Sequence, residues 1–199
     1  MEETQEETFE ETEGEPRPRI EWRGVLRQAL GILRELAETI LPAILIAIFI
    51  NLFLVQATQV LGQSMEPNLH THQRVLVEKV TYRFSHAPQR GDIIVIDLDP
   101  ANTSDDLLIK RIIGLPGDTI EIRGGEVYID NEWLQEPWMT NMGGGNYGPK
   151  TIPPLHVFVM GDNRGASNDS RSFGPIHVDN IVGRAWFSYW PPEEMGLIK

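Results

Sequence analysis

The sequence predicts a mainly β protein, in which a coiled, barrel-like β domain follows one N-terminal transmembrane helix. Three observations lead to this fold class. Residues 39–65 contain no charged side chain, the chain after residue 70 is a series of short strand-like runs, and many of the 18 glycines and 14 prolines separate these runs. Short strands that alternate with glycine and proline turns are typical of all-β domains.

The first 38 residues predict a tail and a surface helix. Residues 1–19 are expected to be a disordered acidic tail, because the first fifteen hold eight glutamates and few apolar side chains to offset the entropy of ordering. Residues 20–38 place apolar side chains such as Trp22, Leu26 and Leu33 at helical spacing, with arginines among the polar positions. A basic amphipathic helix of this kind suits a membrane surface.

Residues 39–58 are the predicted transmembrane helix. A helix of about 19 residues covers roughly the 30 Å hydrocarbon core of a bilayer, and Asn51 is the only strongly polar interruption of the apolar part, residues 40–55. The apolar run is too long and too far from Met1 for a cleaved targeting peptide. Five arginines lie between residues 17 and 34, whereas residues 58–77 carry only Arg74. The positive-inside rule therefore predicts a cytoplasmic N-terminus and an extracytoplasmic β domain.

Residues 59–199 are the predicted β domain. Its expected strands are the short runs at residues 74–79, 93–97, 107–113, 156–160 and 181–190. Residues 119–123 and 126–130 flank two glycines, which predicts a hairpin with a two-residue turn. Residues 141–149 include three consecutive glycines and predict a mobile loop.

Composition excludes several classes of function. The formal net charge of the chain is −12, and the part from residue 61 onward has 18 acidic and 12 basic residues, a net charge of −6. An acidic domain is a poor nucleic-acid binder, because phosphate contacts need clustered lysine and arginine. The chain has no cysteine, which excludes disulfides, thiolate catalysis and cysteine metal sites.

Ser64 and Lys110 are the residues whose surroundings point to chemistry. A serine hydroxyl becomes a nucleophile when a base takes its proton, and lysine can be that base only when neutral. The ordinary lysine pKa of ~10.4 leaves about one in a thousand neutral near pH 7.4, but burial can lower it by up to ~3–5 units. Lys110 lies in an apolar run that could bury it. The alternative is that Ser64 is a solvated hydroxyl and Lys110 a surface charge.

Three blocks follow the apolar segment in order. Residues 64–69 read Ser-Met-Glu-Pro-Asn-Leu, residues 110–118 read Lys-Arg-Ile-Ile-Gly-Leu-Pro-Gly-Asp, and residues 161–171 read Gly-Asp-Asn-Arg-Gly-Ala-Ser-Asn-Asp-Ser-Arg. Together they resemble the type I signal peptidases, or leader peptidases, which are bacterial membrane-bound endopeptidases with a serine–lysine dyad. The resemblance covers roughly residues 41–190. Asn68 and Ala166 depart from the usual Thr and Asn, and Gly62 stands where some members carry a second oxyanion-hole serine.

The resemblance implies a role for each matching residue. Ser64 is expected to attack the scissile carbonyl, with Lys110 as general base and the Ser64 backbone N–H as an oxyanion donor. Ser167 is expected to hydrogen-bond the lysine and orient it. The other supporting residues are Asn163 and two ion pairs, Asp162 with Arg111 and Asp169 with Arg171.

The resemblance also implies substrates and a location. Partners are secretory preproteins with small residues before the cleavage site, and a lipid membrane; nucleic acid, metal and cofactor are not expected. The protein is expected in the plasma membrane, spanning it once. Apolar residues beside the dyad would line shallow substrate pockets: Val60, Met65, Leu69, Leu108 and Ile109.

Other functions fit the sequence less well. A self-cleaving repressor-type protease would need a DNA-binding helix pair, and a membrane-tethered scaffold protein with a decayed site would not cleave. A Ser-His-Asp triad with His177 and Asp179 lacks a nucleophile-elbow pattern. His70 and His72 are two ligands without a third, which is a weak metal site.

Overall fold

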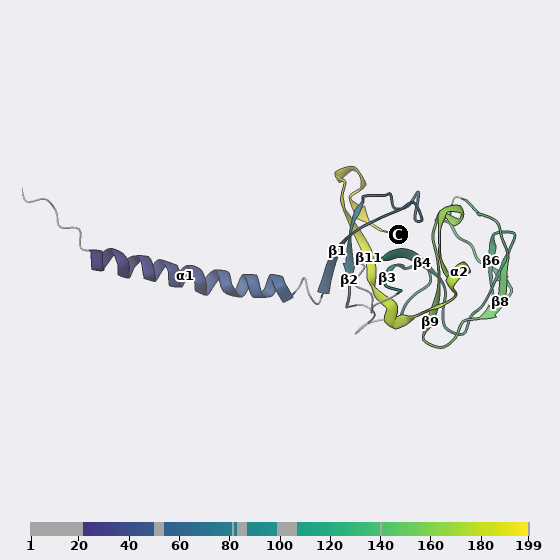
Figure 1. Ribbon diagram of the computed structural model, residues 1–199, viewed down its shortest axis with the longest axis horizontal. Coiled ribbons are helices and arrows are strands. Elements are labelled where there is room, and N and C mark those ends of the chain that lie inside the picture. Colours follow the sequence, from purple (N-terminus) through teal and green to yellow (C-terminus); the bar gives the residue numbers. More distant parts are fainter. Residues whose placement is uncertain are drawn as a thin grey trace, which may run out of the picture. The chain divides into compact units, whose positions relative to one another are not determined.

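The computed structural model describes residues 22–49, 54–80, 82, 87–98, 107–139 and 141–198. The predicted acidic tail, residues 1–19, lies outside this part of the chain. Two compact units are present, Met1–Leu45 and Ile46–Lys199, and each is described by itself. The second unit is mainly β, as predicted (Figure 1).

Helix α1, Trp22–Phe49, is one continuous helix of 28 residues with Pro42 inside it. It therefore joins the predicted surface helix to the first part of the predicted transmembrane helix. The predicted helix end at residue 58 was wrong, because strand β1, Val55–Gln59, pairs antiparallel with strand β2, Arg74–Glu78. No helix in the described ranges has the combination of length and apolar character that crossing a membrane requires.

The larger sheet has eight strands, and the three sequence blocks lie in or directly between its strands. Its order is β1-β2-β11-β3-β4-β9-β10, with β12 paired to β11. The remaining strands are β3 (Ile93–Ile96), β4 (Leu108–Gly114), β9 (His156–Met160), β10 (Ile176–His177), β11 (Ile181–Trp190) and β12 (Gly196–Leu197). The sheet curls without closing (Figure 1), and β1 and β10 are at its two ends. The predicted coiled β domain is therefore present as an open, curled sheet.

Alternate side chains of the larger sheet pack in two different apolar clusters. In β3, Ile93 and Val95 belong to one cluster, and Ile94 and Ile96 belong to another. This division follows from the two-residue period of a strand. Both faces of β3 are buried, which explains its unbroken run of β-branched residues.

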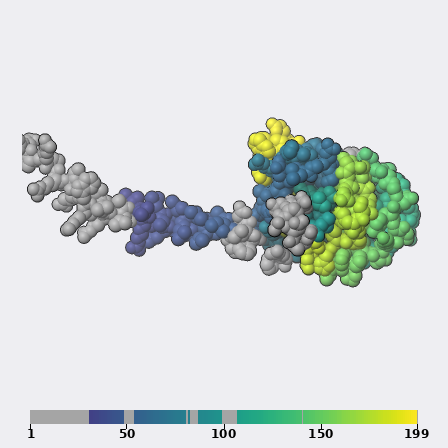
Figure 2. Space-filling model, viewed as in Figure 1, coloured from purple at the N-terminus to yellow at the C-terminus, as the bar shows by residue number. Residues whose placement is uncertain are grey.

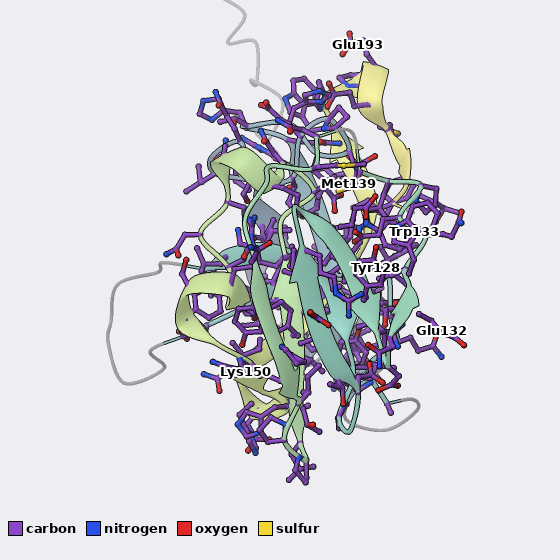
Figure 3. The ribbon with its side chains drawn as sticks, turned by 90° about the vertical axis from the view of Figure 1, so that its right-hand side faces the viewer. Tyr128, Glu132, Trp133, Met139, Lys150 and Glu193 are labelled. Carbon is purple, nitrogen blue, oxygen red and sulfur yellow. The ribbon has the colours of Figure 1, made fainter. Side chains whose placement is uncertain are left out.

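The smaller sheet has four strands in the order β7-β6-β5-β8. Strands β5 (Thr119–Arg123) and β6 (Glu126–Ile129) form the predicted hairpin, and both turn glycines have positive φ, 60° at Gly124 and 98° at Gly125. Strand β7, Glu132–Trp133, adds to β6. Figure 3 shows Tyr128 and Trp133 on this sheet, at positions that are paired in the strand register.

The predicted loop at residues 141–149 is partly a strand. Strand β8, Tyr147–Thr151, pairs with β5 at the edge of the smaller sheet. The glycine and proline at positions 148 and 149 favoured a loop, but an edge strand tolerates proline. A side chain at Gly148 would overlap the carbonyl oxygen of Ile120, so the close strand pairing requires glycine there.

Short helices complete the fold. The 3₁₀ helix η3, Arg164–Ala166, and the α-helix α2, Ser170–Phe173, follow β9 and lie within the third sequence block. Two further 3₁₀ helices are η4, Val178–Asn180, and η5, Pro192–Glu194. In Figure 2 the C-terminal residues, in yellow, lie beside the blue segment that follows β1; His70 Nδ1 is 3.1 Å from Glu194 Oε1 at this contact.

Candidate active site

Ser64 lies in the loop between β1 and β2. Met65 and Leu69, each 1% exposed, anchor this loop in the apolar core, and the N–H of Leu69 donates to the carbonyl of Met65 at 3.0 Å. At the base of the loop, the N–H of Val60 donates to the carbonyl of Gln73 at 2.8 Å. The chain around Ser64 is therefore held at both ends, and the serine itself is half-buried.

Lys110 lies in the middle of β4 and is only 3% exposed. Its Nζ is 2.8 Å from Ser64 Oγ, a distance that suits proton transfer between them. Burial lowers the pKa of Lys110 to about 8, although the negative charges of Asp169 and Asp162 act to raise it. With that pKa, about a fifth of the amine is neutral near pH 7.4.

Arg111, next to Lys110, forms a buried ion pair with Asp162. Its Nε donates to Oδ1 at 2.8 Å and its Nη2 to Oδ2 at 2.7 Å, and both side chains are 1% exposed. A third bond runs from Arg111 Nη1 to the carbonyl of Gly91 at 2.8 Å. A two-point arginine–carboxylate pair has a defined geometry, so it ties β4 to the third sequence block.

Gly161 allows the third block to pack directly against the Ser64 backbone. A side chain at this position would overlap both the carbonyl oxygen of Ser64 and the hydroxyl of Ser167. Two residues on, the N–H of Asn163 donates to the Ser64 carbonyl at 3.0 Å. The block therefore fixes the backbone of Ser64 itself, and the need for glycine at 161 was not anticipated from the sequence.

Asp169 and Arg171 form the second expected pair, with Arg171 Nε 2.8 Å from Asp169 Oδ1. Asp169 is fully buried, caps helix α2, and accepts the N–H of Gly161 at 3.0 Å. Burial acts to raise the pKa of Asp169, but the bonds from Arg171 and Gly161, with the nearby Ser167 hydroxyl, hold that pKa below its usual value. The pair thus fixes the start of the third block.

Ser167 is not placed as expected. Its hydroxyl oxygen is buried and makes no hydrogen bond of normal geometry to any described residue, so the expected bond to the Lys110 amine is not present. The physical reason is local: the Ser167 side chain packs on the α-carbon of Gly161, while the Lys110 amine turns to Ser64.

Four of the five expected substrate residues share one apolar cluster. Val60, Met65, Leu69 and Ile109 are all part of it, together with core residues of β2, β3 and β11. Leu108 packs against the other cluster of the sheet, because it precedes Ile109 in β4 and faces the opposite side.

His177 and Asp179, the alternative catalytic pair, contact each other and not the hydroxyl of Ser64 in the described residues. His177 Nδ1 lies 3.3 Å from Asp179 Oδ2, and its ring stacks edge-on against His156 at 5.1 Å. The side-chain partner of Ser64 Oγ in the described structure is Lys110. Within the same ranges, no group of three or more His, Cys, Asp or Glu side chains is arranged to hold a metal ion.

Two residues of the segment between β7 and β8 contact this site, and no pattern in the sequence predicted these contacts. Glu136 forms a buried ion pair with Arg164, in the third block. The ring of Trp138 lies over the guanidinium of Arg111, 4.7 Å from it. These contacts join residues far apart in the chain and follow no local pattern.

The family described as "Signal peptidase, peptidase S26" matches residues 33–190. The chain belongs to this family. A probable signal peptidase I-2 of Synechocystis sp. is 37% identical over 167 residues, covering 82% of this chain and 76% of the relative. Signal peptidase I of Leptolyngbya laminosa is also 37% identical, over 169 residues that cover 82% of this chain and 83% of the relative.

The chain is also similar to a processing peptidase whose name places it in the chloroplast. Thylakoidal processing peptidase 1 of Arabidopsis thaliana is 32% identical over 180 residues, covering 86% of this chain and 53% of that protein. The resemblance found in the three sequence blocks is confirmed, and the chain is a signal peptidase, a hydrolase of peptide bonds.

Proposed function

We propose that this signal peptidase cleaves preproteins with Ser64 as nucleophile and Lys110 as general base. The observation that carries the proposal is the 2.8 Å separation of Ser64 Oγ and a lysine amine that is 3% exposed. A buried lysine with a pKa of about 8 supplies a neutral amine near neutral pH, which an ordinary surface lysine does not.

Acylation and deacylation each need two proton transfers. Ser64 Oγ attacks the scissile carbonyl while its proton passes to Lys110 Nζ, and the resulting ammonium then protonates the leaving amine as the C–N bond breaks. In deacylation, neutral Lys110 takes a proton from water, whose oxygen attacks the ester, and Ser64 recovers its proton as the acyl group leaves. The backbone N–H of Ser64 is the expected oxyanion donor.

The supporting residues act on geometry. Asp162 and Arg111 hold β4, and the N–H of Asn163 holds the carbonyl of Ser64. Asp169 and Arg171 hold the turn before α2. Preorganised groups of this kind reduce the reorganisation that the transition state demands.

Small residues before the cleavage site are the expected substrate signal. Val60, Met65, Leu69 and Ile109 are between 1% and 7% exposed, so they offer only a small apolar surface to a substrate side chain. An extended substrate can pair with free edge groups of a sheet, as peptides do in other complexes. We therefore expect shallow apolar subsites beside the dyad.

Membrane anchoring through the N-terminal helix is the second part of the proposal. Between residues 32 and 48, helix α1 exposes large apolar side chains, each between 48% and 63% accessible: Ile32, Leu33, Leu36, Ile40, Leu41, Ile44, Leu45, Ile46 and Ile48. Contiguous apolar surface of this kind is unfavourable in water and suits a bilayer. The five arginines between residues 17 and 34, which precede the apolar part of the helix, support a cytoplasmic N-terminus, a single span and an extracytoplasmic site at the plasma membrane.

Cleavage of a preprotein by the detergent-solubilised full-length chain tests the proposal. Wild type should release the signal peptide at a position that follows small residues, and Ser64→Ala should release none. Cleavage by Ser64→Ala at the wild-type rate would refute the assignment of the nucleophile.

A further inference from the structure

Asn68 lies four positions after Ser64 and joins two distant segments through its amide nitrogen. Its Nδ2 donates to the carbonyl of Trp138 at 2.7 Å and to Asp162 Oδ2 at 2.9 Å. A carbonyl and an ionised carboxylate can only accept hydrogen bonds, so the amide must turn its NH₂ group toward them. Both of its N–H groups are thereby used.

The two acceptors belong to one buried network. Asp162 Oδ2 also accepts from Arg111 Nη2 at 2.7 Å, and the ring of Trp138 lies 4.7 Å from the same guanidinium. Asp162 is 1% exposed, whereas Asn68 is itself exposed. Asn68 therefore covers the outer side of the ion pair, on the carboxylate oxygen that Arg111 also uses.

The network connects the base to the nucleophile. Arg111 follows Lys110 in β4, and Asn68 shares with Ser64 a short loop that Met65 and Leu69 bury in the core. Asp162 is next to Asn163, whose N–H holds the Ser64 carbonyl at 3.0 Å. The carboxylate of Asp162 thus touches both segments, through Arg111 on one side and Asn68 on the other.

We propose that Asn68 is a positioning residue, which sets the distance between Ser64 Oγ and Lys110 Nζ by clamping the Ser64 loop to the Asp162–Arg111 pair and to Trp138. This inference rests on the proposed roles of Ser64 and Lys110. Asparagine suits the position because one short side chain supplies two donors. Threonine would supply one and leucine, of similar size, none.

The test uses four variants of the full-length chain with a soluble peptide substrate. Asn68→Leu removes both donors, and Asn68→Thr keeps one. Asn180→Leu is the matched control, because its amide also donates to a backbone carbonyl, that of Asp97 at 2.7 Å, through a bond outside the network. Ser64→Ala reports on the proposed function itself.

The expected result is a loss in kcat and not in KM. Misplacement of a reacting group by 1 Å can cost about 100-fold, so Asn68→Leu should lower kcat by about 10- to 100-fold while KM stays within about twofold. The kcat of Asn68→Thr should lie between those of Asn68→Leu and wild type, and Asn180→Leu should keep the wild-type kcat. The pH at which kcat/KM rises should be higher in Asn68→Leu, because water that reaches the network reduces the burial of Lys110 and so raises its pKa.

Two outcomes separate the inference from the function. If Ser64→Ala is inactive but both Asn68 variants match Asn180→Leu in kcat and pH limb, the positioning role is refuted and the proposed function stands. If Ser64→Ala retains full activity, the proposed function fails and the inference fails with it. Should Asn68→Leu not fold, Asn68→Thr decides: an unchanged kcat overturns the inference, and a lowered kcat with unchanged KM supports it.

Discussion

At the scale of single residues, the position of Lys110 in β4 decides its chemistry. Its neighbour Arg111 has the same charge but lies in a two-point pair with Asp162, and arginine stays protonated in proteins. Lys110 contacts a serine hydroxyl in an apolar environment, and burial lowers its pKa to about 8. In the proposed mechanism, adjacent strand residues therefore have separate tasks, one in proton transfer and one in structure.

Replacement of Lys110 by arginine should abolish cleavage without unfolding the protein. The charge remains but no neutral base forms, so kcat/KM should fall by about 1,000-fold or more, in line with the loss of an activating base. Lys150→Arg is the control, because Lys150 is exposed and lies over the Tyr147 ring. Peptide-cleavage kinetics measure the effect, and circular dichroism verifies that each variant is folded. Wild-type turnover by Lys110→Arg would contradict the assignment of Lys110 as the base.

The rate of cleavage should rise with pH through a value near 8. Burial disfavours the charged amine, so the neutral base accumulates as pH climbs through the lowered pKa of about 8. A histidine base would give a limb near ~6.5. Measurement of kcat/KM from pH 6 to 10 decides between them, with a His156→Ala/His177→Ala variant as control; a limb near 6.5 that disappears in this variant would refute the lysine base.

Stability should depend on the same group with a defined sign. The folded-state pKa of Lys110 lies below its unfolded value of 10.5. Between these values the unfolded chain binds the extra proton, so the contribution of Lys110 to the free energy of unfolding rises with pH in this window. Urea titrations of wild type and Lys110→Met at pH 8 and 10 should show a smaller rise for the variant, and equal rises would contradict the lowered pKa.

At the scale of elements, the turn after β9 is built around a close contact between backbones. Gly161 leaves space that the Ser64 carbonyl and the Ser167 hydroxyl occupy. The N–H of Gly161 is held by Asp169 at 3.0 Å, so the turn has little freedom to move aside. An added methyl group must displace the Ser64 loop.

Gly161→Ala should therefore lower activity by about 10- to 100-fold, through a shift of the serine. Gly165→Ala is the matched control, because a methyl group there would lie 3.7 Å from Asn141 Nδ2, an ordinary contact. Both variants should be assayed for peptide cleavage and for thermal unfolding. Equal kcat/KM in the two variants would show that the close approach at 161 does not position Ser64.

At the scale of the whole molecule, the helix and the β domain are expected to have separate tasks. Ile46–Lys199 is a compact unit that contains every proposed catalytic residue. Delivery of the active site to a membrane is the task that we propose for the helix.

A chain starting at Leu54 should cleave soluble peptides at close to the full-length rate, because it keeps β1 and the bond from Lys79 N–H to the Leu54 carbonyl, 2.9 Å long. Its cleavage of preproteins embedded in lipid vesicles should be slower than that by the full-length chain. A chain starting at Val60 is the control that loses β1 and should melt earlier. Equal rates on vesicle-embedded substrate with and without α1 would refute the delivery role.

The local features of this protein can be predicted from its sequence. Runs of β-branched residues predicted β3, β4 and β9, and paired glycines predicted the hairpin of β5 and β6, because strand and turn preferences act over a few residues. The blocks around Ser64, Lys110 and Asp162 were also visible, since each is contiguous. Strand alternation further required that Lys110 and Arg111 face different surroundings.

The contacts between these features depend on the folded arrangement of distant segments. Strand order brings Ser64 to Lys110 across 46 positions and Asn68 to Asp162 across 94, and no local preference encodes either contact. The same non-local pairing made a strand of residues 55–59, of which residues 55–58 were expected in a helix. The hydroxyl of Ser167 likewise lacks the bond to Lys110 that the sequence block suggested. Hydrogen bonds and close packing between distant segments outweigh the propensity of a single short segment, because each such segment gains little stability by itself.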